Sequence, residues 1–148
     1  MRILITGAGG SAAYNFYDAL KLAFDDLYTV GADARPQHLE LIDVDKKYIV
    51  PLVTDPNYID TINKIIEKEK IDFVHPQPDV EVNFLSKHAD KINAKIFLPS
   101  FDVVEACHDK MTFNKILREK GVAVPKAYHI KTPDDLKHAL DDLLKLQP

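Results

Sequence analysis

Near its N-terminus the chain reads Ile3-Leu4-Ile5, followed at once by Thr6-Gly7-Ala8-Gly9-Gly10-Ser11-Ala12. A short apolar run that ends in a glycine cluster is typical of a buried strand. From Ser11 to about Phe24, apolar residues recur at three- and four-residue spacing, which predicts an amphipathic helix. This segment therefore predicts a buried strand, a tight turn and a helix, in that order.

The same alternation continues along the chain. Asp55 is predicted to cap a second long helix with Pro56 at its first position, and the last turn of that helix, residues 67–70, is predicted to be solvated. Another helix is predicted over about 79–89, and a single helical turn near residues 39–42. Five strands that alternate with helices predict a doubly wound α/β domain with a mostly parallel sheet. The predicted strands are 3–5, 28–33, 48–51, 71–74 and 95–98.

After Pro99 the pattern changes. Short helices are predicted behind Ser100 and Asp109, and Gly121 is expected to end the second. A strand over 127–130 and a helix opened by Thr132 are predicted to follow. The chain is thus divided into a domain at 1–99 and a helical connector with a β–α unit at 100–148. Because such a unit needs further strands to pair with, we expect the chain to be part of a longer protein.

Composition excludes several function classes. The 148 residues include 19 basic and 23 acidic side chains and a single cysteine. A net charge of −4 disfavours general binding to nucleic acid or to anionic membranes, and one cysteine excludes an internal disulfide framework or a multi-cysteine metal site. No apolar run approaches the ~20 residues that cross a bilayer. We expect a soluble, cytoplasmic protein. The composition is compatible with a homo-oligomer.

The glycine cluster is the first candidate site. It matches the dinucleotide-binding fingerprint with Ala12 in place of the third glycine. Gly7 allows the tight turn, Gly9 lets backbone approach a ligand, and the helix start offers unpaired N–H groups. Asp33 follows the second strand, where a ribose-binding acid would stand. Two interpretations stay open: a nucleotide site, or a turn that any such sheet needs beside a merely solvated Asp33.

The second candidate site is His75-Pro76-Gln77-Pro78-Asp79-Val80-Glu81, after the fourth strand. Ligands of doubly wound sheets lie over the carboxyl ends of the strands, so this segment should face the same crevice as the glycine cluster. Asp79 and Glu81 are candidates to accept hydrogen bonds from an amine or hydroxyl group of a substrate. For Asp79 the alternative role is to cap the following helix.

No complete catalytic or metal-binding constellation is present in the sequence. Gly-x-Ser-x-Gly, Walker-type and His-Glu-x-x-His patterns are absent. Tyr17 and Lys21 form a Tyr-x-x-x-Lys string, but they lie on the first helix, which is the wrong place for a dehydrogenase proton donor. We therefore predict no catalytic residue and no metal ligand within these 148 residues.

The order of these segments resembles the N-terminal part of an ATP-grasp ligase, most like the carbamoyl-phosphate-synthase large-subunit type. The Asp109-Lys110 pair followed by Gly121-Val122-Ala123-Val124-Pro125 is the most telling combination. The resemblance covers nearly the whole chain. Its other segments are Thr6-Gly7-Ala8-Gly9-Gly10, Gly31-Ala32-Asp33, Tyr48-Ile49-Val50-Pro51, Tyr58-Ile59, Ile71-Asp72-Phe73-Val74-His75-Pro76 and Asp79-Val80-Glu81.

The resemblance implies a Rossmann-like pre-ATP-grasp domain, a connector and further subdomains that clamp MgATP. Such enzymes phosphorylate a carboxylate, and an amine, thiol or other nucleophile attacks the acyl phosphate. It implies that Lys110 reaches the ATP phosphates and that the glycines serve the turn without NAD. The residues that it places on the acceptor-substrate side are Gly7, Gly9, Gly10, Ser11, Asp33, Asp79 and Glu81.

The family's second nucleotide lysine, its glycine-rich lid and its metal ligands would all lie beyond Pro148. We therefore expect the chain itself to be inactive, with ATP and Mg²⁺ bound by the full-length protein and neither held tightly here. The expected partners are ATP and a small-molecule carboxylate. Two alternatives remain: an NAD-binding domain of an epimerase or dehydrogenase, and a non-catalytic binding module.

Overall fold

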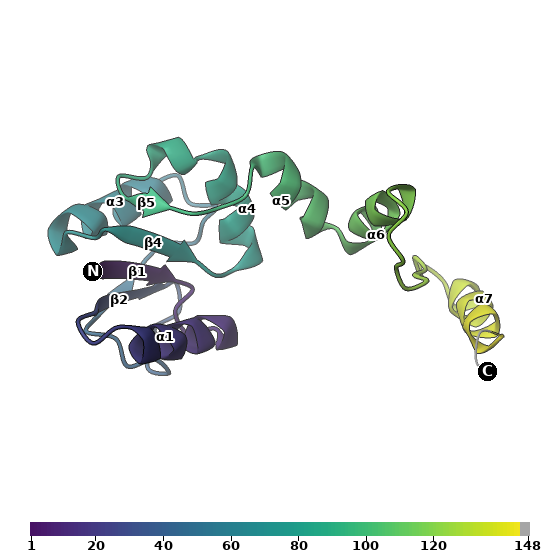
Figure 1. Ribbon diagram of the computed structural model, residues 1–148, viewed down its shortest axis with the longest axis horizontal. Helices are drawn as coiled ribbons and strands as arrows, with labels where there is room; N and C mark the ends of the chain where they lie inside the picture. The colour runs from purple at the N-terminus through teal and green to yellow at the C-terminus, as the bar shows by residue number, and fades with distance from the viewer. Residues whose placement is uncertain (146–148) are drawn as a thin grey trace. The chain divides into compact units, whose positions relative to one another are not determined.

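The computed structural model describes residues 1–145 and contains a five-stranded sheet in the order β3-β2-β1-β4-β5, with every pair of neighbours parallel. Figure 1 shows β2, β1, β4 and β5 side by side. The predicted doubly wound α/β fold is confirmed. Because β2 and β3 lie on one side of β1 and β4 and β5 on the other, the winding reverses next to β1. The strands are β1 (Arg2–Thr6), β2 (Tyr28–Asp33), β3 (Lys46–Ile49), β4 (Phe73–Pro76) and β5 (Lys95–Ile96).

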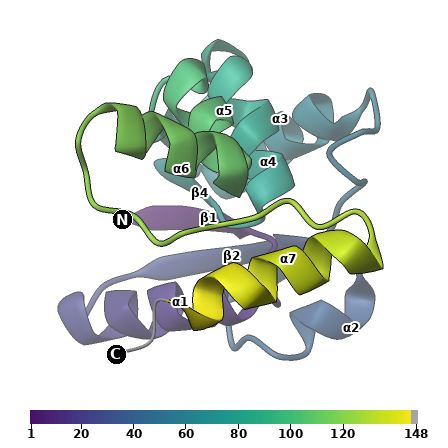
Figure 2. The same ribbon diagram turned by 90° about the vertical axis from the view of Figure 1, so that its right-hand side faces the viewer.

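Helices cover both faces of this sheet, with α1 (Ser11–Ala23) and α2 (Pro36–Leu39) on one face (Figure 2). The other face carries α3 (Tyr58–Glu69) and α4 (Asp79–Lys87). Successive side chains of a strand point to opposite faces, so Ile3 and Ile5 join the core under α1 and α2 while Leu4 joins the core under α3 and α4. This alternation explains why the first strand is apolar throughout.

The chain forms two compact units that divide after Val104. The second unit contains α6 (Lys110–Glu119) and α7 (Pro133–Leu144), while α5 (Phe101–His108) crosses the division and a short 3₁₀ turn lies at Ala89–Lys91 in the first unit. Asp109 caps α6 by accepting from the Thr112 N–H at 2.6 Å, as predicted. Thr132 and Asp135 form a reciprocal capping box on α7. Among residues 1–145, no helix has the length and apolarity needed to span a membrane.

Four predicted strands differ from the observed ones in their bounds, and the first of them is one residue longer at each end than 3–5. The third strand lies two residues earlier than 48–51, the fourth lies two residues later than 71–74, and the fifth ends at Ile96. Strand bounds are decided by pairing, here by Asp33 opposite Ile49 and by Thr6 opposite Pro76. Val50 and Ile71 stay buried just outside the paired segments, so apolar sequence alone misplaces the ends.

Helix starts show further differences. The helix α3 begins at Tyr58 with Asn57 as its N-cap residue, whereas Asp55 accepts from the Asn57 N–H at 2.8 Å in the preceding turn. Asp79 is the first residue of α4 rather than its cap, because Pro78 occupies the N-cap position. The strand expected at 127–130 is not formed within the described chain, since a strand requires a neighbour to pair with.

Candidate functional site

A cleft of about 400 Å³ opens at the carboxyl ends of the strands, where the winding of the sheet reverses. This is the position at which doubly wound sheets bind ligands. Both candidate segments reach it, as the crevice argument predicts. The predicted site residues that line it are Gly7, Gly10, Ser11, Asp33 and Glu81, whereas Gly9 and Asp79 do not belong to its lining and Lys110 lies in the second unit.

Gly7 makes the turn from β1 into α1. Its φ of +58° is in the left-handed region, and a Cβ at this position would lie 2.3 Å from Cγ of Pro78. The Gly10 N–H closes the turn by donating to the Gly7 carbonyl at 3.0 Å. Gly10 is also the N-cap residue of α1 and has no side chain, so the start of that helix faces the cleft without a side-chain cap.

Gly9 is required for a different reason. A Cβ on Gly9 would lie 2.3 Å from Cβ of His38 and 2.4 Å from the His38 carbonyl oxygen. The helix α2 therefore occupies the space beside the Gly9 backbone that a dinucleotide pyrophosphate would need under the fingerprint interpretation. Packing within the protein is sufficient to account for this glycine.

Asp33 is buried at the end of β2, with 7% of its surface exposed, and is not the solvated acid considered above. Its carboxylate accepts from the Arg35 N–H at 2.9 Å and from the Gly9 N–H at 3.4 Å. The His38 Nδ1 atom lies 3.3 Å away. Asp33 thus joins the glycine loop to α2, and both of its oxygens already have partners within the protein.

Glu81 presents a second buried carboxyl group to the cleft, from the first turn of α4. The Thr6 hydroxyl donates to its Oε2 atom. Burial raises the pKa of Glu81, and the nearby charge of Asp33 acts in the same direction, although the Thr6 and Tyr58 hydroxyls favour the carboxylate form. Asp79, its predicted companion, is exposed. The structure therefore separates the two acids, and only Glu81 faces the cleft.

Tyr58 is a polar group for which the sequence predicts no role. It is completely buried at the start of α3, and its hydroxyl has no hydrogen-bond partner among the described residues. Burial raises the pKa of Tyr58, and the adjacent Glu81 carboxyl raises it further. In the sequence, an aromatic residue at the start of a helix predicts packing in the core. The folded chain shows in addition that the Tyr58 hydroxyl lies beside the Glu81 carboxyl.

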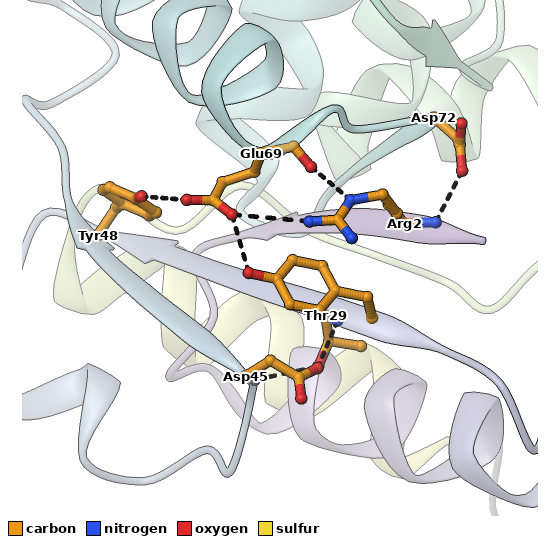
Figure 3. Close-up of polar contacts among 7 residues, drawn as sticks. Arg2, Thr29, Asp45, Tyr48, Glu69 and Asp72 are labelled. Carbon is orange, nitrogen blue, oxygen red and sulfur yellow. Dashed lines mark hydrogen bonds and ion pairs between the residues drawn. The ribbon is translucent and has the colours of Figure 1, made fainter.

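A second polar cluster lies at the opposite, amino end of the strands (Figure 3). Glu69 accepts from the Tyr28 hydroxyl at 2.8 Å and from the Tyr48 hydroxyl at 2.5 Å, and Arg2 Nη2 lies 3.8 Å from its Oε2 atom. The two hydroxyl hydrogen bonds lower the pKa of Glu69, with the Tyr48 hydroxyl the largest cause. The prediction of a solvated last turn is therefore wrong for Glu69, which is buried.

The same close-up shows further hydrogen bonds that connect the strands to neighbouring segments at this end of the sheet. The Arg2 backbone N–H donates to Asp72 at 2.8 Å, and Asp45 accepts from the backbone and the hydroxyl of Thr29 at 2.7 and 2.9 Å (Figure 3). Each of these bonds joins a strand to the segment beside it. The cluster stabilises the sheet at the end remote from the cleft.

Comparison with known proteins identifies relatives of the chain. Residues 3–97 match the family model described as PylC-like, N-terminal domain. A segment of 98 residues is 31% identical to the carbamoyl phosphate synthase large chain of Pyrococcus furiosus, which corresponds to 62% of this chain and 9% of that protein. The chain therefore spans only a small part of this relative.

Similar solved structures include the L-amino acid ligase from Bacillus licheniformis, with a TM-score of 0.60 and 15% identity over 97% of this chain and 42% of that one. The N5-carboxyaminoimidazole synthetase from Staphylococcus aureus complexed with ADP gives a TM-score of 0.61 and 16% identity over 96% of this chain and 36% of that one. At these identities the likeness concerns the fold. Because the family model covers most of the chain, this chain belongs to the PylC-like N-terminal domain family, the pre-ATP-grasp part of the ATP-grasp ligases.

Proposed function

We propose that this chain is the substrate-side part of an ATP-dependent ligase that joins a carboxylate to an amine or a similar nucleophile, and that its cleft holds the nucleophile. The observation that carries this proposal is the buried Glu81 carboxyl at the switch point of the sheet. The dinucleotide markers Gly9 and Asp33 are instead engaged with His38 and Arg35, which supports this proposal over NAD binding.

In the proposed reaction, ATP transfers its terminal phosphoryl group to the carboxylate and leaves as ADP. The nucleophile held in the cleft then loses its proton, attacks the carbonyl carbon of the acyl phosphate and displaces inorganic phosphate. Mg²⁺ would neutralise charge on the transferring phosphoryl group. No group of three potential metal ligands occurs among residues 1–145. By the family resemblance, we propose that residues of the longer protein hold Mg²⁺. Lys110, exposed at the start of α6, is the residue that we propose contacts the ATP phosphates.

The surface of α7 supports the proposal that more protein packs on the second unit. Ala139 is the buried residue of this helix, while its other apolar side chains remain 40–60% exposed. An amphipathic helix normally buries its apolar stripe against another element. The exposed apolar residues are Leu136, Leu140, Leu143 and Leu144.

The first prediction tests the reaction. The 148-residue chain is expected to release no ADP from MgATP above the buffer rate and to give no saturable change in NADH fluorescence. The polypeptide continued by the residues that its gene encodes after Pro148 is expected to release ADP when a carboxylate and an amine are both supplied. Saturable NADH binding that is lost in Asp33→Asn would favour the dehydrogenase alternative. A stop codon directly after Pro148 would instead favour a binding module.

The second prediction concerns Lys110. In the longer protein, Lys110→Ala is expected to raise the KM for ATP about tenfold, because one charge-assisted contact to phosphate contributes roughly 1.4 kcal/mol. Lys120→Ala, which removes an exposed lysine from the other end of α6, is the matched control and should leave this KM unchanged. Equal KM values in the two variants would show that Lys110 is only a solvated side chain.

A further inference from the structure

We infer that Glu81 binds the ammonium group of the cleft's ligand as a carboxylate, and that the buried Tyr58 hydroxyl donates to this carboxylate in the complex. This inference rests on the proposed function, because it names the chemical class that the substrate-side cleft accepts. It assigns Glu81 as a binding residue and Tyr58 as a positioning residue that acts through it.

The charged groups around the cleft favour Glu81 over Asp33 as the binding carboxylate. Both Asp33 oxygens are engaged by backbone N–H groups and by His38. Of the two Glu81 oxygens, Oε2 accepts from Thr6, while Oε1 has no hydrogen bond among the described residues. Arg35 also lines the cleft, but it is exposed. One oxygen of this buried residue is therefore free to meet a ligand.

The rim of the cleft indicates the rest of the ligand. Leu52 and Val80 line it and are 64% and 58% exposed, although both are apolar. A ligand with an alkyl chain next to its ammonium group would cover these side chains while its charge pairs with Glu81. The favoured class is therefore an alkylammonium compound rather than an inorganic cation.

The unpartnered Tyr58 hydroxyl is the second, independent observation. A fully buried hydroxyl without a partner is costly, and such groups in native proteins call for an explanation. A protonated carboxyl group needs few donors around it, whereas a carboxylate is stabilised by several. The Thr6 and Tyr58 hydroxyls would together supply two donors to ionised Glu81. The ligand's positive charge favours that ionised form, so its binding should lower the pKa of Glu81.

The third prediction tests this coupling with butylammonium chloride as the probe. The Glu81 carboxyl carbon is followed by NMR against pH, and its titration midpoint is expected to fall by about one pH unit when the probe is bound. 1-Pentanol and pentanoate, which have a similar size without the positive charge, should cause no such fall. Glu81→Gln is expected to weaken butylammonium binding at least about tenfold. Unchanged binding in Glu81→Gln would overturn the inference.

Tyr58→Phe separates positioning from structural support. This variant removes the unpartnered hydroxyl, so it should fold normally, yet it is expected to weaken butylammonium about tenfold and to raise the Glu81 midpoint in the complex. Tyr28→Phe, at the other end of the sheet, should change neither quantity. If Tyr58→Phe leaves the midpoint and the binding unchanged, Tyr58 has no positioning role. Failure of butylammonium to bind while the longer protein still releases ADP would reject this inference alone, whereas binding without ADP release would reject the proposed ligase function.

Discussion

Gly9→Ala is expected to lower the free energy of unfolding by about 3 kcal/mol, as overpacking against backbone commonly does. The new Cβ would meet the His38 Cβ at 2.3 Å and the His38 carbonyl oxygen at 2.4 Å, so α2 would have to move. A shift of α2 would also disturb the bonds that Asp33 makes to Gly9 and Arg35. Urea unfolding followed by circular dichroism measures this loss.

Gly10→Ala is the matched control, because it places the same methyl group one residue further along the loop. The nearest atom to that Cβ is the Gly7 carbonyl oxygen at 3.3 Å, and the φ of Gly10 is −77°, which alanine adopts freely. Its cost should stay below about 1 kcal/mol, the difference between glycine and alanine at an N-cap position. Equal losses in the two variants would mean that α2 does not pack against Gly9 as described.

Glu69→Ala is expected to destabilise the chain by about 2 kcal/mol at neutral pH, since two hydroxyl groups lose a charged acceptor. The contact to Arg2 adds little, because that side chain is partly exposed. Glu67→Ala removes an exposed acid from the same helical turn and should change stability far less. Comparable losses in the two variants would contradict the cluster at the amino end of the sheet.

The effect of Glu69 should also depend on pH in a defined direction. The Tyr48 and Tyr28 hydroxyls lower the pKa of Glu69 below its ordinary value of 4.5. The folded state therefore gains stability from Glu69 above that value and loses it as the pH falls through the lower pKa of the folded state. The stability difference between the native chain and Glu69→Ala should thus be full at pH 7 and shrink below about pH 4. A difference that grew on acidification would reverse the assigned sign.

Every strand and main helix of the sheet domain was predicted to occur in the observed order, although several bounds differ, because the signals for an element are local. The alternation of apolar runs with amphipathic segments can be recognised from neighbouring residues alone. Gly7 indicates a turn with a positive φ, which few other residues adopt. The ends of β3 and β4 could not be predicted as well from the sequence. Their bounds depend on register with β2 and β1, which lie far away in the sequence.

The position of the candidate site could be predicted from the sequence, but the separate roles of its acidic residues could not. Parallel strands place their carboxyl ends at one edge, so Gly7, Asp33 and Glu81 had to converge. Nothing in the sequence indicated that Asp33 would be satisfied within the protein. The difference between Asp79 and Glu81 arises from which side of α4 faces the cleft.

Short-range periodicity and backbone preference were enough to predict the layered α/β architecture, the tight first turn and the edge of the sheet at which the cleft opens. The burial of Glu69 within a charged run and the position of the Tyr58 hydroxyl beside Glu81 became visible in the folded chain alone. Both depend on segments distant in sequence meeting in space. Burial increases the energetic effect of hydrogen-bond partners and of ionisation states. The burial of a polar side chain cannot be predicted from a local sequence pattern.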